Sequence, residues 1–290
     1  MTVIELIEAG ARRLADAGVA FGHGTANAFD EAAWLVLWKL GHPLDRIDAH
    51  ADDAVDATQQ AAVEALLAER IATRKPAAYL TREAWLQGVP FYVDERAIVP
   101  RSFIAEIIGN GDIDYWLREQ TRSVLDLCTG NGSLAVLAAL VWPDVRVDAI
   151  DLSTDALAVA ATNVERHALQ QRITLRQGNG LAAARGVYDL ILCNPPYVNR
   201  ESMTALPAEY RFEPPIALDG NTEGGTDGMD FIRRMIKTVA RYLSEEGVLV
   251  LEVGNERAHF EAAFKHLLPI WLPTSAGDDQ VLLLTREQLA

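Results

Sequence analysis

The chain has 290 residues, of which 50% are hydrophobic, so it can bury a large core in one domain or two. Its 26 lysines and arginines and 41 aspartates and glutamates leave a formal net charge of −15. This balance opposes nucleic acid as the principal ligand, because neutralising phosphates requires clustered cationic side chains, and it favours a cationic ligand or a basic protein partner.

Cysteine content and hydropathy indicate the cellular compartment of the protein. The only two cysteines, Cys128 and Cys193, are not spaced like the ligands of a metal site. We therefore expect a reduced, cytoplasmic protein without a metal site. The N-terminus lacks the apolar stretch of a signal peptide, and no run is long enough to cross a bilayer, so no membrane association is expected.

Residues 1–78 carry helical periodicity and no strand pattern. Thr2 and Glu5 have the spacing of a capping box, and the apolar residues after them recur at helical intervals. Two further helices are expected over about 28–40 and 55–73. We therefore predict a small N-terminal helical domain over residues 1–78.

Residues 79–100 change to a strand-like period. Two apolar runs, at Trp85 and at Phe91, flank Gly88, which predicts a hairpin that connects two domains. A helix should follow over 102–117, with its first residue, a serine, as the N-cap.

From residue 123 onward, strands and helices alternate regularly, which is typical of a doubly wound parallel sheet. Strands are expected near 123–128, 145–150, 172–176, 187–193 and 247–253, with helices near 132–141, 153–168, 226–243 and 255–267. At the end of the chain, Trp271-Leu272 and Val281–Leu284 flank a Gly-Asp-Asp loop, and this antiparallel hairpin should close the sheet. The expected fold is α/β, with a doubly wound, mostly parallel seven-stranded sheet over residues 101–290.

The strand expected over Tyr188–Cys193 stops at a polar tetrapeptide, Asn194-Pro195-Pro196-Tyr197. In open α/β sheets, ligands bind at the carboxyl ends of the strands. The Asn194 side-chain carbonyl and the Pro195 backbone carbonyl can accept both hydrogens of a planar NH2 group, while Tyr197 offers a flat face for stacking. The dipeptides alone fit a turn that ends a strand equally well.

A second candidate site lies after the strand that starts near residue 123. Gly130 and Gly132 let a backbone approach a ligand closely, and Asp151, at the end of the next strand, can bind both hydroxyls of a ribose. Gly130-x-Gly132-x-x-Ala135 also matches a degenerate dinucleotide fingerprint. Asp126 beside this turn disfavours a pyrophosphate and favours a sulfonium and an amino group, which favours a methyl donor over NAD.

Together these motifs resemble the S-adenosylmethionine-dependent methyltransferases of the HemK group, which modify the side-chain nitrogen of glutamine in proteins of the translation apparatus. The family's NPPY signature corresponds to 194–197, its glycine-rich loop to 126–132 and its ribose carboxylate to Asp151. The resemblance covers nearly the whole chain and implies a class I methyltransferase fold with S-adenosylmethionine as cofactor. The cofactor-binding residues that we expect are Asp126, Cys128, Thr129, Gly130, Gly132, Asp151, Leu152, Asn179, Gly180 and Asn194. The catalytic residues that we expect are Asn194, Pro195 and Tyr197.

The connector indicates one branch of this family. Ala78-Tyr79-Leu80-Thr81, Trp85, Phe91–Arg96 and Val99-Pro100-Arg101-Ser102 look like the branch that methylates a large-subunit ribosomal protein, as do Tyr210–Pro214 and Gly225–Gly228. The release-factor branch usually has Pro-Arg-Pro-Glu-Thr where this chain has Pro-Arg-Ser-Phe. The resemblance thus implies a ribosomal large-subunit protein as partner, free or in an early assembly intermediate.

Three alternatives stay open. A release factor is the first, and an amine of nucleic acid is the second, because NPPY also occurs in methyltransferases that act on exocyclic amines of DNA bases. The second alternative requires a basic face, which the composition does not predict, and no direct nucleic-acid binding is expected. The third is a catalytically idle scaffold, which should have a disrupted acceptor loop, whereas this loop is intact.

The chain departs from the family pattern at two places. After the third strand the family usually has Ser-Asp-Leu-Phe, whose aspartate accepts from the adenine amine, but here Gly178-Asn179-Gly180-Leu181 follows. The Asn179 carbonyl can accept that bond without a charge. The loop 219–225 is also longer than expected, and we predict that it is a mobile lid.

Overall fold

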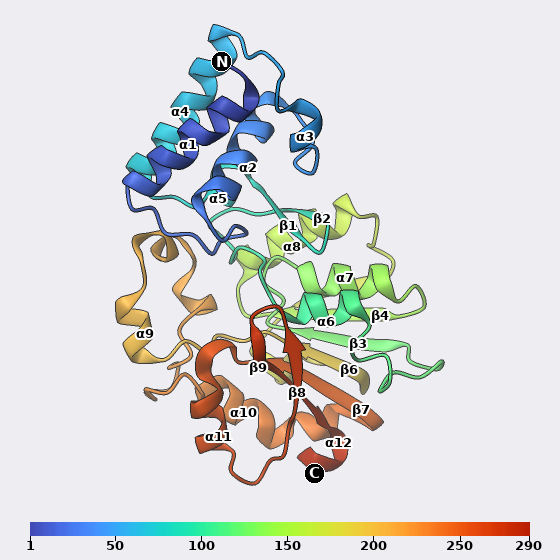
Figure 1. Ribbon diagram of the computed structural model, residues 1–290. Helices are drawn as coiled ribbons and strands as arrows, with labels where there is room; N and C mark the ends of the chain where they lie inside the picture. The colour runs from blue at the N-terminus through green and yellow to red at the C-terminus, as the bar shows by residue number, and fades with distance from the viewer.

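The computed structural model describes residues 1–290, and its N-terminal part is a bundle of helices (Figure 1). The helices are α1 (Val3–Asp16), α2 (Ala28–Leu40), α3 (Ile47–His50), α4 (Ala57–Thr73) and α5 (Ala77–Thr81). The expected capping box is present, because Thr2 Oγ1 accepts from the Glu5 N–H at 3.4 Å and Glu5 Oε2 accepts from the Thr2 N–H at 2.9 Å. The four-residue α3 and five-residue α5 were not predicted, since they are too short to show a period.

A charged side chain lies in the interior of this bundle. Arg70 of α4 is fully buried, and its Nε donates to Glu31 Oε1 at 2.8 Å while its Nη2 donates to the Ala20 carbonyl at 3.0 Å. Its Nη1 lies 3.6 Å from Glu209 Oε1, which also forms an ion pair with Arg74, at 2.9 Å from Nε. Glu209 belongs to the C-terminal half of the chain, so this ion cluster joins the bundle to the rest of the protein.

The connector forms the predicted hairpin. Strands β1 (Glu83–Leu86) and β2 (Val89–Tyr92) are antiparallel, and the two turn residues between them, Gln87 and Gly88, have φ of 50° and 73°. Two left-handed residues in succession are typical of a hairpin turn whose twist matches that of its strands. The next helix, α6 (Ile104–Asn110), is shorter than expected, because Gly111 adopts the left-handed conformation that ends it.

The remaining strands form one seven-stranded sheet in the order β5-β4-β3-β6-β7-β9-β8. Their bounds are β3 Ser123–Leu127, β4 Arg146–Asp151, β5 Ile173–Gln177, β6 Tyr188–Cys193, β7 Leu243–Glu252, β8 Ile270–Thr274 and β9 Gly277–Thr285. Neighbouring strands from β5 to β7 are parallel, and β9 is antiparallel to β7 and β8. The predicted fold class is confirmed. The Gly-Asp-Asp stretch, however, belongs to β9, and the hairpin turn lies before it.

Helices cover both faces of this sheet (Figure 1). One face packs against α6, α7 (Ser133–Val141) and α8 (Thr154–Arg166), and the other packs against α10 (Asp230–Val239), α11 (Arg257–Ala263) and α12 (Arg286–Leu289). Successive strand residues serve opposite faces: Val124 packs in the first core and Leu125 in the second. This burial on both faces explains the apolar runs of β6 and of the second half of β7, whereas β4 and β5, toward the sheet edge, are more polar.

The stretch between β6 and α10 was not predicted in detail. It contains α9 (Arg200–Ala205) and then residues 206–218, which we call the wall segment because several of its residues line the cavity described below. The wall segment includes two 3₁₀ turns and carries Glu209 into the bundle. No helix of the protein combines the length and the apolar composition needed to span a bilayer.

Arg70→Met should lower the free energy of unfolding by about 3–5 kcal/mol, because Glu31 and Glu209 lose their buried cation while the apolar stem is kept. Urea denaturation followed by circular dichroism measures this change. Arg12→Met is the matched control, since Arg12 is exposed and lies 3.9 Å from Glu8 one helical turn away; its loss should be below about 0.5 kcal/mol. Equal losses in the two variants would contradict a structural role for the cluster.

Candidate active site

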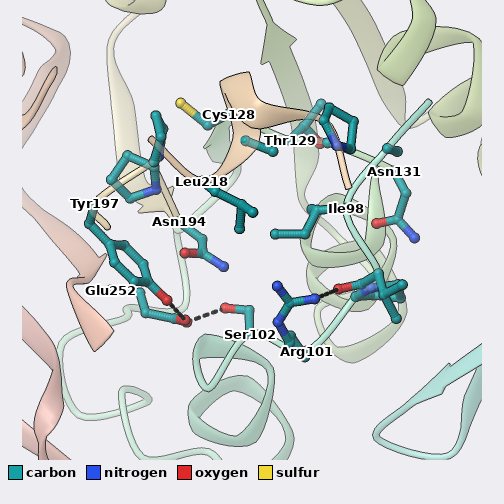
Figure 2. A pocket seen from close by; sticks show the side chains of 18 of the residues that line it. Ile98, Arg101, Ser102, Cys128, Thr129, Asn131, Asn194, Tyr197, Leu218 and Glu252 are labelled. Carbon is teal, nitrogen blue, oxygen red and sulfur yellow. Dashed lines mark hydrogen bonds between the residues drawn. The ribbon is translucent and has the colours of Figure 1, made fainter. Parts of the chain in front are cut away.

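One cavity of about 1220 Å³ opens where the carboxyl ends of β3, β4, β6 and β7 meet. The side chains around it point inward from these strand ends and from the connector (Figure 2). The cavity also reaches the helical bundle, so all three parts of the chain contribute to its wall.

Asn194 lies directly after β6 and points into the cavity (Figure 2). It is half-buried, and its side-chain amide makes no hydrogen bond within the protein. Pro195, which is buried, and Pro196 have no N–H, so the carbonyl groups of this turn are not matched by local donors. The turn therefore presents hydrogen-bond acceptors to whatever occupies the cavity.

Tyr197 is held at the side of the cavity by Glu252. Its hydroxyl donates to Glu252 Oε1 at 3.1 Å, and Glu252 Oε2 accepts from Ser102 Oγ at 2.5 Å and from the Phe103 N–H at 2.9 Å. Burial and the adjacent carboxylate raise the pKa of Tyr197 well above its usual range, so it remains a neutral phenol. The Cβ of any residue other than glycine at Gly254 would come within 2.6 Å of the Tyr197 ring.

The loop after β3 approaches the cavity, but two of its expected ligand-binding residues do not face it. Asp126 is fully buried beneath the loop, where its Oδ2 accepts from Thr129 Oγ1 at 2.5 Å and from the Ala135 N–H at 3.0 Å. Gly132 packs on α8, where an added Cβ would lie 3.1 Å from the Ala160 Cβ. Both residues shape the loop, which corrects the expectation that the Asp126 charge lies beside the ligand.

Cys128, Thr129 and Gly130 do line the cavity. Cys128 has φ of 63°, a left-handed conformation that favours glycine, so this position holds local strain next to the cavity. A hydrogen bond with the Cys193 thiol, together with burial, raises the pKa of Cys128 well above its usual range. A thiol that stays protonated is a poor nucleophile, so no nucleophilic role is assigned to Cys128, and its contact with a cofactor stays a prediction.

Asp151 ends β4 and faces the cavity, and each of its carboxylate oxygens accepts one backbone hydrogen bond. Oδ2 accepts from the Gly130 N–H at 2.8 Å, and Oδ1 accepts from the Ser153 N–H at 2.8 Å. These two bonds fix the carboxylate, and each oxygen keeps a second lone pair for a ligand hydroxyl. Burial raises the pKa of Asp151, although the backbone donors partly offset this effect.

Leu152, Asn179 and Gly180 line the part of the cavity next to Asp151. Asn179 Oδ1 accepts from Arg234 Nη2 at 3.1 Å, so the carbonyl that we expected to receive an adenine amine already has one donor. Arg234 also lies over the ring of Phe231, at 5.4 Å from its centroid. Phe231 was not predicted as a site residue, and one phenylalanine in a helix gives no signal that it lines a cavity.

Two other lining residues, Glu252 and Arg101, were not predicted, although the sequence contains a signal for Glu252. Glu252 is the only charged residue in an otherwise apolar run at the end of β7, and such a residue is almost never fully buried unless it is paired. Arg101 binds Glu213 through two parallel bonds, from Nη1 to Oε1 at 2.5 Å and from Nη2 to Oε2 at 2.7 Å. Its partner is distant in sequence, so spacing could not have revealed this pair.

The loop 219–225, which we expected to be a lid, is held by several hydrogen bonds to neighbouring residues. Asp230 Oδ2 accepts from the N–H groups of Glu223 and Gly225 at 2.8 and 2.9 Å, and Asn221 Nδ2 donates to the Val198 carbonyl at 3.1 Å. One residue of this loop, Thr222, lines the cavity. Its mobility stays a prediction.

Two protein-family models match the chain. The methyltransferase small domain matches residues 115–209, and the PrmC N-terminal domain matches residues 5–81. The first match contains the strands β3 to β6 with their loops, and the second covers most of the helical bundle.

Curated relatives match over almost the full chain. A ribosomal protein uL3 glutamine methyltransferase of Bordetella pertussis is 53% identical and covers 99% of this chain and 96% of its own length. Proteins of the same name from Burkholderia pseudomallei and Neisseria meningitidis are 50% and 44% identical, again over 99% of this chain and over 95% and 94% of their own lengths. Among solved structures, the catalytic domain of hMettl16 has a TM-score of 0.52 at 14% identity, covering 79% of this chain and 81% of its own, which supports the fold alone.

Asp126→Asn should change how stability depends on pH. Burial raises the pKa of Asp126 to about 7, so the folded protein keeps a proton that the unfolded chain releases. The wild-type free energy of unfolding should therefore fall as the pH rises from about 4 to about 7, and the asparagine variant should lack this component, which is at most roughly 4 kcal/mol. Urea denaturation at several pH values across this window measures it. Parallel pH curves for the two proteins would contradict the assignment of Asp126 as a buried group.

Proposed function

The chain belongs to the family of the ribosomal protein uL3 glutamine methyltransferases, and we propose that it methylates the side-chain amide nitrogen of a glutamine in this large-subunit ribosomal protein, with S-adenosylmethionine as the methyl donor. One observation carries the proposal: the unpaired Asn194 amide and the proline turn after it face the same cavity as the Asp151 carboxylate. An acceptor for a planar NH2 group and an acceptor for a ribose thus lie in one site.

On the acceptor side, Asn194 Oδ1 and the Pro195 carbonyl accept the two N–H groups of the substrate amide. An amide nitrogen is a poor nucleophile because its lone pair is delocalised, so the main contribution of these residues is to orient it. The same two acceptors favour the positive charge that develops on the nitrogen. Tyr197, fixed by Glu252, forms the wall of this subsite, and its π face favours a cationic methyl group.

On the cofactor side, Asp151 binds the ribose hydroxyls, and Gly130 allows close approach of the loop. When bound, S-adenosylmethionine supplies an electrophilic methyl group on a sulfonium. The residues present fit this molecule, because the fixed Asp151 carboxylate retains acceptor capacity and Leu152 with Phe231 gives an apolar surface next to it. Asp126 acts indirectly, by holding the loop after β3 in shape.

No side chain is assigned as a general base. The methylated amide is a cation that loses its proton readily to water, so the reaction requires no base before the transfer. Glu252 is the carboxylate beside Tyr197, but each of its oxygens already accepts a hydrogen bond from the protein. It therefore positions Tyr197.

The choice of a ribosomal protein over a release factor is supported by position 102. The Ser102 hydroxyl donates to Glu252, whereas the release-factor pattern has a proline at this position, which has no donor. The bundle of residues 1–78 and the connector of residues 79–100 provide the docking surface for the substrate in this proposal. A cytoplasmic location belongs to the same proposal and is supported by the low cysteine content.

Two substitutions should have opposite effects if these roles are correct. Asn194→Ala should abolish methyl transfer and leave the affinity for S-adenosylmethionine within a few-fold of wild type. Asp151→Ala should weaken cofactor binding tens-fold or more, because it removes charge-assisted hydrogen bonds of about 1.5 to 3 kcal/mol each. Calorimetric titration measures the affinity for the cofactor and a methyl-transfer assay measures activity, so together they distinguish the two variants. Loss of cofactor binding in the Asn194 variant, or preferential binding of NAD by the wild type, would overturn the assignment.

The substrate should be modified before it is covered by RNA. Ribosomal proteins are typically basic, and a chain with a net charge of −15 should attract one that is still free. We expect methylation of the free protein or an early assembly particle, none of the mature subunit, and weaker association at high salt. A side-by-side assay with a release factor is the control. Faster modification of the release factor would reverse the substrate assignment and leave the glutamine chemistry intact.

A further inference from the structure

Three side chains that can bind a metal ion lie together in the helical bundle. They are His42, which follows the end of α2, His50, the last residue of α3, and Asp53, which lies between α3 and α4. One ligand atom from each residue, a ring nitrogen or a carboxylate oxygen, lies within 4.8 Å of the other two. None of the three residues lines the active-site cavity, so the proposed methyl transfer does not use them.

The spacing of these groups is close to that of metal ligands. The rings of His42 and His50 are stacked, with 4.0 Å between centroids and 21° between planes, and His50 Nδ1 lies 2.8 Å from Asp53 Oδ2. Two ligand atoms of a tetrahedral zinc ion lie about 3.3 Å apart, because each bond is about 2.0 to 2.1 Å long. Rotating the half-buried rings out of their stack therefore moves the ligand atoms by at most about 1.5 Å to reach this spacing.

The backbone that carries the three side chains is fixed by hydrogen bonds. The N–H of His42 donates to the Leu37 carbonyl of α2 at 2.9 Å, and the N–H of Asp53 donates to the His50 carbonyl at 3.0 Å. The Asp53 carbonyl accepts from the Val3 N–H, at the start of α1, at 3.1 Å. Only side-chain rotations are then needed to bind an ion, which keeps the entropic cost of binding low.

Space and charge at this place also suit a cation. A cavity of about 310 Å³ has His42 and Asp53 in its wall, so an ion has room for bound water molecules. The segment of residues 42–56 has one arginine, Arg46, against five aspartates, which are Asp45, Asp48, Asp52, Asp53 and Asp56. This excess of negative charge raises the local concentration of cations.

We propose that His42, His50 and Asp53 bind one divalent transition-metal ion, with zinc as the expected occupant and water completing its coordination. Imidazole nitrogens suit zinc, cobalt and nickel, whereas magnesium and calcium require oxygen ligands. The bound ion joins the end of α2, α3 and the segment before α4, and it stabilises this part of the bundle. The sequence-based expectation of no metal site followed from the two cysteines, which are not involved here. This inference does not depend on the proposed function.

The test uses the full-length protein without a histidine tag, after a chelator has removed bound metal and has itself been removed. Titration calorimetry should show one zinc ion bound per chain, with magnesium bound at least 100-fold more weakly. His42→Asn and Asp53→Asn should each weaken zinc binding about 10-fold or more, because each removes one ligand. His266→Asn is the matched control, since His266 is an exposed histidine outside this cluster, and its Kd should equal that of wild type.

Nuclear magnetic resonance of the wild-type protein identifies the ligands without relying on any variant. One equivalent of zinc should shift the ring-nitrogen signals of His42 and His50 and leave those of His266 unchanged. Unshifted signals of the two histidines, or equal zinc affinity in wild type, His42→Asn and Asp53→Asn, would overturn the inference and show adventitious binding only. Methyl transfer by the metal-free protein should stay within about two-fold of that with zinc, so the failure of this inference leaves the proposed function intact.

Discussion

The arrangement of the active site depends on two buried carboxylates of the wall segment, Glu209 and Glu213. Glu209 forms an ion pair with Arg74 and lies beside the buried Arg70, whereas Glu213 forms the two parallel bonds with Arg101, and its Oε2 lies 3.5 Å from His23 Nε2. Burial alone would raise the pKa of Glu213, but Arg101 and His23 outweigh it and hold the pKa at about 2. An unpaired charge at such a site costs several kcal/mol, so the bundle, the connector and the wall segment are stable only in this mutual arrangement. These contacts hold the wall segment in place along the cavity that contains Asn194.

The seven-stranded sheet positions the remaining residues of the active site. Parallel strands deliver their carboxyl ends to one edge, and here they bring Asp151 from β4 and Asn194 from β6 to opposite sides of strand β3, which lies between them. In the proposed function, these two residues direct the cofactor and the acceptor to adjacent subsites. Rigid side chains surround the point where they meet, because Tyr197 is held by Glu252 and the loop after β3 is held by Asp126. Such preorganisation suits a reaction in which orientation is the main contribution of the enzyme.

The fold and the positions of Asn194 and Asp151 could be predicted from the sequence, for a physical reason. Strands buried on both faces are largely apolar, and polar residues at their carboxyl ends lie at the sheet edge. The apolar run of β6 locates Asn194, and the regular alternation of strands and helices locates the fold and Asp151 at the end of β4. The role of Asp126 was mistaken, because a sequence pattern places a residue on a strand and does not tell whether its carboxylate faces the ligand or lies under the loop. The bond from Ser102 to Glu252 joins residues 150 positions apart, and the Arg70–Glu209 pair is similarly distant. Neither leaves a local period, so only the folded chain reveals them.

The central claim is that a glutamine of uL3 is the acceptor held at the Asn194 turn. It is tested most directly by mass spectrometry of the whole set of ribosomal proteins and release factors from cells that lack this gene, compared with the same cells carrying the gene. The account predicts that a single methyl group disappears from one glutamine of uL3 and returns with the gene, while the release factors keep their modification. An unchanged uL3, or the loss of a methyl group from a release factor instead, would contradict it.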